Sequence, residues 1–488
     1  MVNYMKKSTT NQSGAFKEAI KNIFAKPHLF FLVTSVFFGL TFLFLTPPLQ
    51  GPDEQAHFLQ AYKLSEGNFI NDATDSYPTS LRHTYKTIMY NDDIRFNYKN
   101  KYEFWRTKDA LKIPLNQQIR EVGDGYMSGT SYSPVVYIGQ SFMIFVGRLF
   151  NLAPVVLIYM ARLGNLAVWI GLVYFAIKKS PIGKWSFAVL GILPMALFQG
   201  AVITADAFLM GTLILYVAYI LRLFVQKSPV TKKQYVVAAI IATCMALSKI
   251  IMLIFVPLVL LLVLKKHSEG TKEPRLYKKY LGIVFVLFVA TSIALVWSVL
   301  SKNLSAGSNL PDGANPPLQI HYLIRQPGEF LFALWNTNFY EWSDGITRST
   351  IGTFGWSDTP MALSFMVLGY LSLFVVMVAN RGKEFTSAGA LTSKYSRMFI
   401  VTLGVIYFLA VSFALYAYYS PVNYNIIVGL QGRYFLPIFV LPVVLFLNKD
   451  QAVFKDKLYN LMTRTTPIML LAISMVYIIM RYYFHSTV

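Results

Sequence analysis

The feature that most constrains the fold is an alternation of long apolar runs with short clusters of lysine and arginine, repeated along almost the whole chain. Of the 488 residues, 55% are hydrophobic and only 14% are charged, whereas soluble domains average roughly 25% charged residues. Several runs reach or approach the ~20 residues that a membrane-spanning helix needs. The sequence therefore predicts an all-α polytopic membrane protein.

The basic residues predict how this chain is oriented. The net charge is +21, but the lysines and arginines are spread over short clusters between apolar runs and form no single patch, which disfavours nucleic-acid binding. Residues 1–27 carry five lysines against one acid. Because cytoplasmic segments are enriched in basic residues, we expect a cytoplasmic N-terminus.

We expect about eleven transmembrane helices, within a range of 10–13. Segment 134–150 contains Gln140, Ser141 and Arg148 and is expected to lie in the interface or to be half inserted. If it crossed the bilayer, the later lysine clusters would fall outside the cell. The expected spans are residues 29–45, 154–177, 185–203, 205–225, 235–248, 250–264, 280–300, 361–380, 397–419, 434–448 and 466–484.

These spans divide the chain into four parts. Residues 1–27 form a cytoplasmic segment, residues 28–300 a transmembrane module with a large external loop at 47–133, and residues 360–488 the C-terminal transmembrane helices. The first loop should be folded, with short interfacial helices, because loops of this length are seldom structureless. Between the module and the C-terminal helices, residues 301–359 form a second external loop. Its Trp335, Tyr340 and Trp342 suit a helix at headgroup level.

An acidic pair stands where the first span leaves the membrane. Three prolines and a glycine end that helix, and Asp53 and Glu54 then open an amphipathic helix with His57 one turn later. The pair could simply complement the positive end of the new helix. Its position at the bilayer edge instead indicates a functional site. Asp53 and Glu54, with His57, could also bind a divalent cation such as Mg²⁺ or Mn²⁺.

Three further ionisable residues are expected on the same external side. Asp206 lies between two spans and could cap a helix or form a second site carboxylate. Lys249 ends a short hairpin and could reach the interface or meet a lipid phosphate. Arg433 follows Gly432, which permits close backbone approach, and its planar guanidinium suits either a phosphate or a structural ion pair. Ionisable residues at membrane depth are costly and mark functional sites.

A glycine-rich segment supplies candidates for substrate binding. Trp356 and Asp358 combine an indole with a carboxylate, a composition typical of a sugar-stacking loop but also of an ordinary interfacial turn. We include Asp206, His57 and Gln431 with them as substrate-binding candidates.

Five segments together resemble the bacterial DUF2142 family of polytopic membrane proteins. They are residues 48–58, Tyr132-Ser-Pro, residues 193–199 with residues 204–206, residues 355–359 and residues 429–437. That family is similar to the GT-C superfamily of membrane glycosyltransferases, which implies a seven-span module, an acidic motif in the first external loop and polyprenyl-phosphate sugar donors. The resemblance puts the motif acid at Asp53 or Glu54. It also implies the plasma membrane of a bacterium.

We therefore predict a glycosyltransferase that moves a sugar from a polyprenyl-phosphate donor to a cell-wall polysaccharide, teichoic acid or lipid-linked glycan at the outer face, with inversion. Asp53 or Glu54 would be the base, and Arg433 and Lys249 would bind the donor phosphate. The alternatives are a flippase for a lipid-linked glycan and a non-catalytic scaffold of an envelope-synthesis complex.

Overall fold

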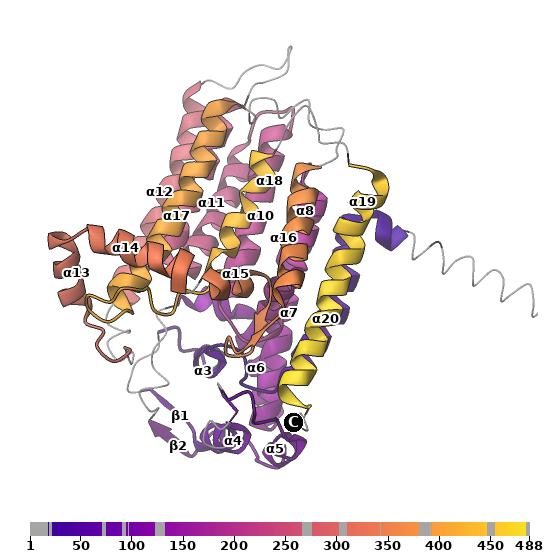
Figure 1. The fold of residues 1–488 in the computed structure, drawn as a ribbon, viewed down its shortest axis with the longest axis vertical. Coiled ribbons are helices and arrows are strands. Elements are labelled where there is room, and N and C mark those ends of the chain that lie inside the picture. The colour runs from indigo at the N-terminus through magenta and orange to yellow at the C-terminus, as the bar shows by residue number, and fades with distance from the viewer. Residues whose placement is uncertain are drawn as a thin grey trace, which may run out of the picture.

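The computed structural model shows a bundle of long helices with its loops gathered at the two ends (Figure 1). It describes residues 22–70, 75–89, 94–95, 97–122, 132–265, 276–301, 310–341, 343–379, 393–446 and 454–484, together with Glu18 and Leu391. Most of the predicted cytoplasmic segment 1–27 lies outside these residues.

Six helices in the described residues are long and apolar enough to cross a membrane. They are α2 (Pro27–Leu45), α7 (Pro154–Lys179), α10 (Asp206–Val225), α12 (Leu276–Ser301), α17 (Lys394–Tyr418) and the continuous helix formed by α19 (Asp456–Asn460), the π-helical turn η8 (Leu461–Thr465) and α20 (Thr466–Tyr482). The all-α polytopic class is confirmed. The count of eleven spans stays a prediction.

Shorter apolar helices complete the bundle. They are η2 (Pro134–Tyr137) with α6 (Ile138–Leu149), α8 (Lys184–Gly191), α9 (Pro194–Ala201), α11 (Lys232–Ser248), η3 (Ile250–Leu264), α16 (Leu363–Val378), and η7 (Gly432–Val440) with α18 (Pro442–Leu445). The 3₁₀ geometry of η3 makes it longer than an α-helix of the same number of residues. Its 15 residues, rising ~2.0 Å each, extend about 30 Å, the thickness of a bilayer core. A short apolar run can therefore still reach across.

Two segments depart from simple spanning helices. The expected span 185–203 is two helices, α8 and α9, because the Pro194 ring prevents a continuous helix through this point. Segment Pro134–Leu149 is a short helical stretch packed on α7, about 24 Å long by α-helical rise. At this crossing a Cβ on Gly164 would lie 2.1 Å from the Gly139 carbonyl oxygen, so only glycine permits the contact.

The first external loop folds at one end of the bundle, as expected (Figure 1). It contains α3 (Glu54–Ser65), β1 (Ser76–Pro78), α4 (Thr79–Met89), α5 (Phe104–Ala110) and β2 (Arg120–Val122), with β1 and β2 paired antiparallel. The second loop contains α13 (Pro316–Arg325), α14 (Gly328–Asn336), the π-helical turn η5 (Thr337–Glu341), α15 (Ser343–Ile351) and the hairpin of β3 (Thr353–Phe354) and β4 (Thr359–Pro360).

Helix α14 lies across the bundle axis rather than along it (Figure 1). Trp335 is 61% exposed and Tyr340 82% exposed, which suits a helix resting in the headgroup layer. Trp342 lies outside the described residues.

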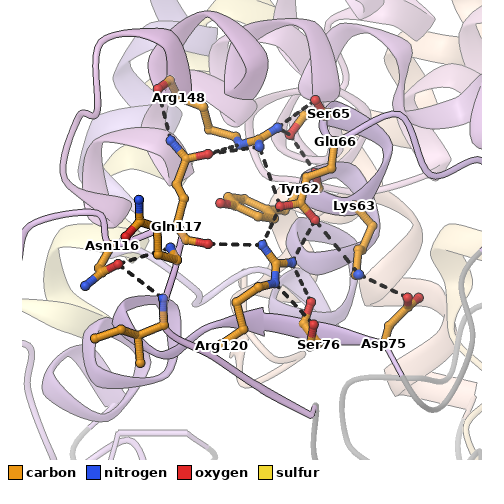
Figure 2. Close-up of polar contacts among 12 residues, drawn as sticks. Tyr62, Lys63, Ser65, Glu66, Asp75, Ser76, Asn116, Gln117, Arg120 and Arg148 are labelled. Carbon is orange, nitrogen blue, oxygen red and sulfur yellow. Dashed lines mark hydrogen bonds and ion pairs between the residues drawn. The ribbon is translucent and has the colours of Figure 1, made fainter.

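A polar cluster fixes the first loop to the bundle (Figure 2). Glu66, just after α3, accepts two hydrogen bonds from Arg120 of β2, at 2.8 and 2.9 Å, and pairs with Arg148 of α6 at 3.5 Å. Lys63 of α3 pairs with Asp75 at 3.0 Å. The loop is thereby tied to α6 by charge-assisted bonds, and α3 is held in one orientation.

Candidate functional site

A cavity of about 500 Å³ lies among α10, the α11–η3 junction, α17 and η7. Its charged and hydrogen-bonding lining residues are Gln199, Asp206, Lys249, Tyr407, Tyr418, Tyr419, Arg433 and Tyr434, with Trp169, and aliphatic residues make up the rest. The structure therefore brings together Asp206, Lys249 and Arg433, three of the ionisable residues that the sequence singled out, although the first and the last are more than 200 positions apart.

Arg433 is placed by the backbone before it. A Cβ on Gly432 would lie 2.0 Å from the Ile346 carbonyl oxygen, so glycine is required where η7 meets α15, and the Gly432 N–H donates to Ser349 Oγ at 2.7 Å. The Arg433 side chain is 8% exposed, and its Nε has no hydrogen-bond partner among the described residues. A buried guanidinium N–H without a partner is costly, so this group is suited to receive an acceptor from a ligand.

Lys249 lies between α11 and η3 in extended backbone. Its ammonium group is 5.0 Å from the ring centroid of Tyr434 and 6.0 Å from that of Tyr132. The Arg433 guanidinium lies 5.2 Å from the same Tyr434 ring. Two cations thus flank one aromatic ring beside the cavity, which makes this wall attractive to an anion.

Asp206 is the first residue of α10, the most buried of the six long helices. The N-cap position of α10 is occupied by Ala205, so Asp206 is not the N-cap residue that the sequence suggested but an acid in the first helical turn. The turn before it is held by Asn165 of α7, whose Nδ2 donates to the carbonyl oxygens of Gln199 and Val202 at 3.0 and 2.6 Å. Gln140 of α6 donates to the Thr204 carbonyl at 3.2 Å. Together these bonds fix where the Asp206 carboxylate enters the cavity.

Asp53 precedes α3 in the left-handed region, with φ 54°. Its side chain is exposed and makes no capping bond. Among the described residues its carboxylate interacts electrostatically with His57 and Arg433 and forms no hydrogen bond or ion pair. Non-glycine residues adopt this conformation at an energetic cost, and such strain collects at functional sites. The carboxylate is available to a ligand, as a catalytic base must be.

His57 connects Asp53 to the cavity wall. Its Nδ1 lies 2.7 Å from Tyr137 Oη, and its ring centroid is 5.6 Å from that of Tyr132, whose ring centroid also lies 6.0 Å from Lys249 Nζ. Burial lowers the pKa of His57, against the charges of Asp53 and Asp206, and so favours the neutral imidazole.

Glu54 is placed quite differently from Asp53. Its side chain and that of Arg162 on α7 are both 0% exposed and form a bidentate ion pair at 2.6 and 2.7 Å. Glu54 also accepts from the N–H groups of Gly51 at 3.0 Å and Ile203 at 3.1 Å. A carboxylate with four donors has neither the access nor the free lone pairs that a base or a metal ligand needs, so we correct the expectation that Glu54 could serve as either.

The glycine-rich segment does not enter the cavity. Trp356 donates to the Leu49 carbonyl at 3.3 Å and stacks on the Arg95 guanidinium at 4.0 Å. Asp358 accepts two bonds from Arg481, at 2.9 and 2.6 Å. These partners hold the β3–β4 hairpin against the first loop and α20. We therefore correct the expectation that Trp356 and Asp358 bind substrate.

Gln431 lies beside this hairpin and accepts from Ser357 Oγ at 3.3 Å. Its side chain therefore connects the hairpin to the start of η7. No group of three or more His, Cys, Asp or Glu residues in the described ranges is placed to hold a metal ion.

Comparison with known proteins agrees with this architecture. A family model described as a predicted membrane protein (DUF2142) matches residues 36–442. The chain belongs to the DUF2142 family. No curated protein and no solved structure matches it.

In this DUF2142 protein, several residues that position the site could hardly be recognised from the sequence around them. Arg162, Asn165 and Gln140 lie on apolar helices, where their polarity was the only indication of a role. Polar residues within membrane helices usually face a partner. Here the partners are Glu54 and the turn before Asp206, and neither can be identified from spacing along one helix.

Proposed function

We propose that this DUF2142 protein is a membrane glycosyltransferase of GT-C type, which transfers a sugar from a polyprenyl-phosphate donor to an acceptor hydroxyl of a cell-envelope glycan at the outer membrane face. The observation that carries the proposal is that Lys249 and Arg433 line one cavity, and that Arg433 Nε has no hydrogen-bond partner among the described residues. Asp53 does not line this cavity, but its negative charge interacts electrostatically with Arg433.

The chemistry assigns a role to each group. The acceptor oxygen attacks the anomeric carbon of the donor, the bond from that carbon to the phosphate oxygen breaks, and the electron pair leaves with the phosphate. Asp53 takes the proton of the acceptor hydroxyl. Lys249 and Arg433 stabilise the negative charge that develops on the leaving phosphate. A single displacement of this kind inverts the anomeric centre.

The apolar part of the cavity supports a lipid-linked donor. Beyond the charged wall the lining is aliphatic and aromatic, and includes Leu310, Val411, Leu415 and Leu436. An isoprenoid chain fits such a surface, whereas a soluble nucleotide sugar would bring a second polar end that these residues cannot bind.

The test uses the purified full chain in lipid with radiolabelled polyprenyl-phosphate hexoses and a cell-wall glycan acceptor. Transfer should occur with wild type and be lost in Asp53→Asn, while donor binding persists. The matched control is Asp109→Asn, which removes an acid from the same external loop where it only pairs with exposed Lys112 at 2.7 Å.

Two outcomes contradict the proposal. Transfer in Asp53→Asn at the wild-type rate removes the proposed base. Donor binding without transfer from any sugar, together with movement of labelled lipid across the bilayer, replaces the enzyme with a flippase.

A further inference from the structure

A second large cavity, of about 450 Å³, lies at the other end of the bundle. It is formed by the first turns of α11 and α12 and by the last turn of η3. The cavity lies remote from the candidate site, because α11 runs from Lys232 at the cavity to Ser248, and η3 runs back from Ile250 to Leu264, on either side of Lys249. The lysine bias of the sequence places this end in the cytoplasm.

Four lysines line this cavity, and its described lining contains no aspartate or glutamate. Lys265 and Lys279 are inner residues, held by carbonyl groups. Lys265 Nζ donates to Leu223 and Ser228, both at 2.8 Å, and Lys279 Nζ donates to Val263 at 2.7 Å. The other two, Lys232 and Lys278, are exposed at the cavity mouth.

Three of the four lysines lie where helix electrostatics disfavours them. Lys232 is the first residue of α11, and Lys278 and Lys279 are in the first turn of α12. Helix N-termini already carry partial positive charge, so cations there raise the local potential further. An anion in this cavity would relieve that repulsion and could bond with both exposed ammonium groups.

The remaining lining is apolar. Val236 and Leu281 are 45% and 65% exposed, and Phe285 is 41% exposed, on helix faces that point away from the core. A ligand with an anionic head and an apolar tail matches both parts of this surface, whereas a free inorganic anion uses only the lysines.

We propose that this cavity binds the phosphate headgroup of an anionic glycerophospholipid of the cytoplasmic leaflet, with one acyl chain along Val236 and Phe285. Basic pockets between membrane helices at this depth suit such headgroups. Lys265 and Lys279 form the fixed floor, and Lys232 and Lys278 close on the phosphate. The site is separate from the proposed transferase site, and neither proposal depends on the other.

The test is native mass spectrometry of the detergent-solubilised full chain, titrated with phosphatidylglycerol or with phosphatidylcholine of the same acyl chains. Phosphatidylglycerol should bind more tightly. In Lys232→Gln/Lys278→Gln its affinity should fall about 25-fold, since each basic residue near a membrane surface contributes about 5-fold. Both side chains are exposed, so the fold should be unaffected.

The matched control is Lys227→Gln/Lys233→Gln, which removes the same charge from exposed lysines at the same end that do not line the cavity. It should keep the phosphatidylglycerol affinity. Equal binding of the two lipids, or an equal loss in both double variants, overturns the proposal. Glycerol phosphate that competes as well as the intact lipid shows a soluble phosphate site and overturns it too, as does tighter binding of a polyprenyl phosphate.

Discussion

Replacing Glu54 by Gln should lower the stability of the folded protein rather than impair the proposed sugar transfer directly. The variant leaves Arg162 charged and fully buried without its counter-ion, since both side chains are 0% exposed. Removing one partner of a buried ion pair costs about 3–5 kcal/mol. Arg162 would keep its bonds to the carbonyl oxygens of Leu43, Thr46 and Pro47, at 2.6–2.9 Å, which places the expected cost near the lower end, about 3 kcal/mol.

The assay is thermal unfolding of the purified variant in detergent. An unfolding entropy of ~2.1 cal/mol/K per residue would give about 1 kcal/mol/K for the 488 residues, so the midpoint should fall by at least ~3 °C. A membrane protein keeps much of its helix on unfolding, which makes the true entropy smaller and the shift larger. The double variant Glu54→Gln/Arg162→Gln removes both charges and should be less destabilised than the sum of the two single variants.

The same variants separate the roles of the two adjacent acids. Folded Glu54→Gln should transfer sugar, because Asp53 is the proposed base. A Glu54→Gln protein with the wild-type melting temperature and no activity would refute this reasoning, since it would show that Glu54 acts in chemistry and not in packing.

Three further predictions concern other groups. Lys249→Met should weaken binding of the polyprenyl-phosphate donor by about 10-fold or more in a binding assay, because a charge-assisted bond contributes ~1.5–3 kcal/mol. Arg433→Lys should also weaken donor binding, because the planar guanidinium is lost. Asp358→Asn leaves the buried Arg481 without its counter-ion, so the free energy of unfolding should fall by ~3 kcal/mol and the melting temperature should fall with it. The donor affinity should be unchanged. Burial lowers the pKa of His57 below its ordinary value of 6.5. As the pH falls, the unfolded chain therefore binds a proton at His57 before the folded chain does, so the contribution of the neutral imidazole to stability is complete above pH 6.5 and is lost at lower pH. Between about pH 7.5 and about pH 5 the melting temperature of wild type should fall more than that of His57→Gln.

The fold class could be predicted because it depends on composition and run length. Apolar runs, lysine clusters and helix-breaking prolines are local properties, and they located most of the helices to within a few residues. Pro194 was visible too, but whether a proline kinks a helix or divides it depends on the packing around it. Here both α8 and α9 pack against α2 and α7, and α8 also packs against α16.

The site could be predicted only in part. Asp206, Lys249 and Arg433 were found because ionisable residues near membrane depth are costly, and the cavity brings all three together. The fates of Glu54 and Asp358 depend on Arg162 and Arg481, which lie 108 and 123 positions away. No local pattern encodes a pairing over that distance.

The contrast between Asp53 and Glu54 shows how one dipeptide supports two tasks. The Glu54–Arg162 pair joins the start of α3 to α7 and, through the Ile203 N–H, to the turn that carries Asp206. With α3 fixed at this point, Asp53 is held in a left-handed conformation that an unconstrained chain would leave. The buried acid therefore determines where the exposed acid stands, and the ion pair stabilises the geometry that leaves the Asp53 carboxylate open to a substrate.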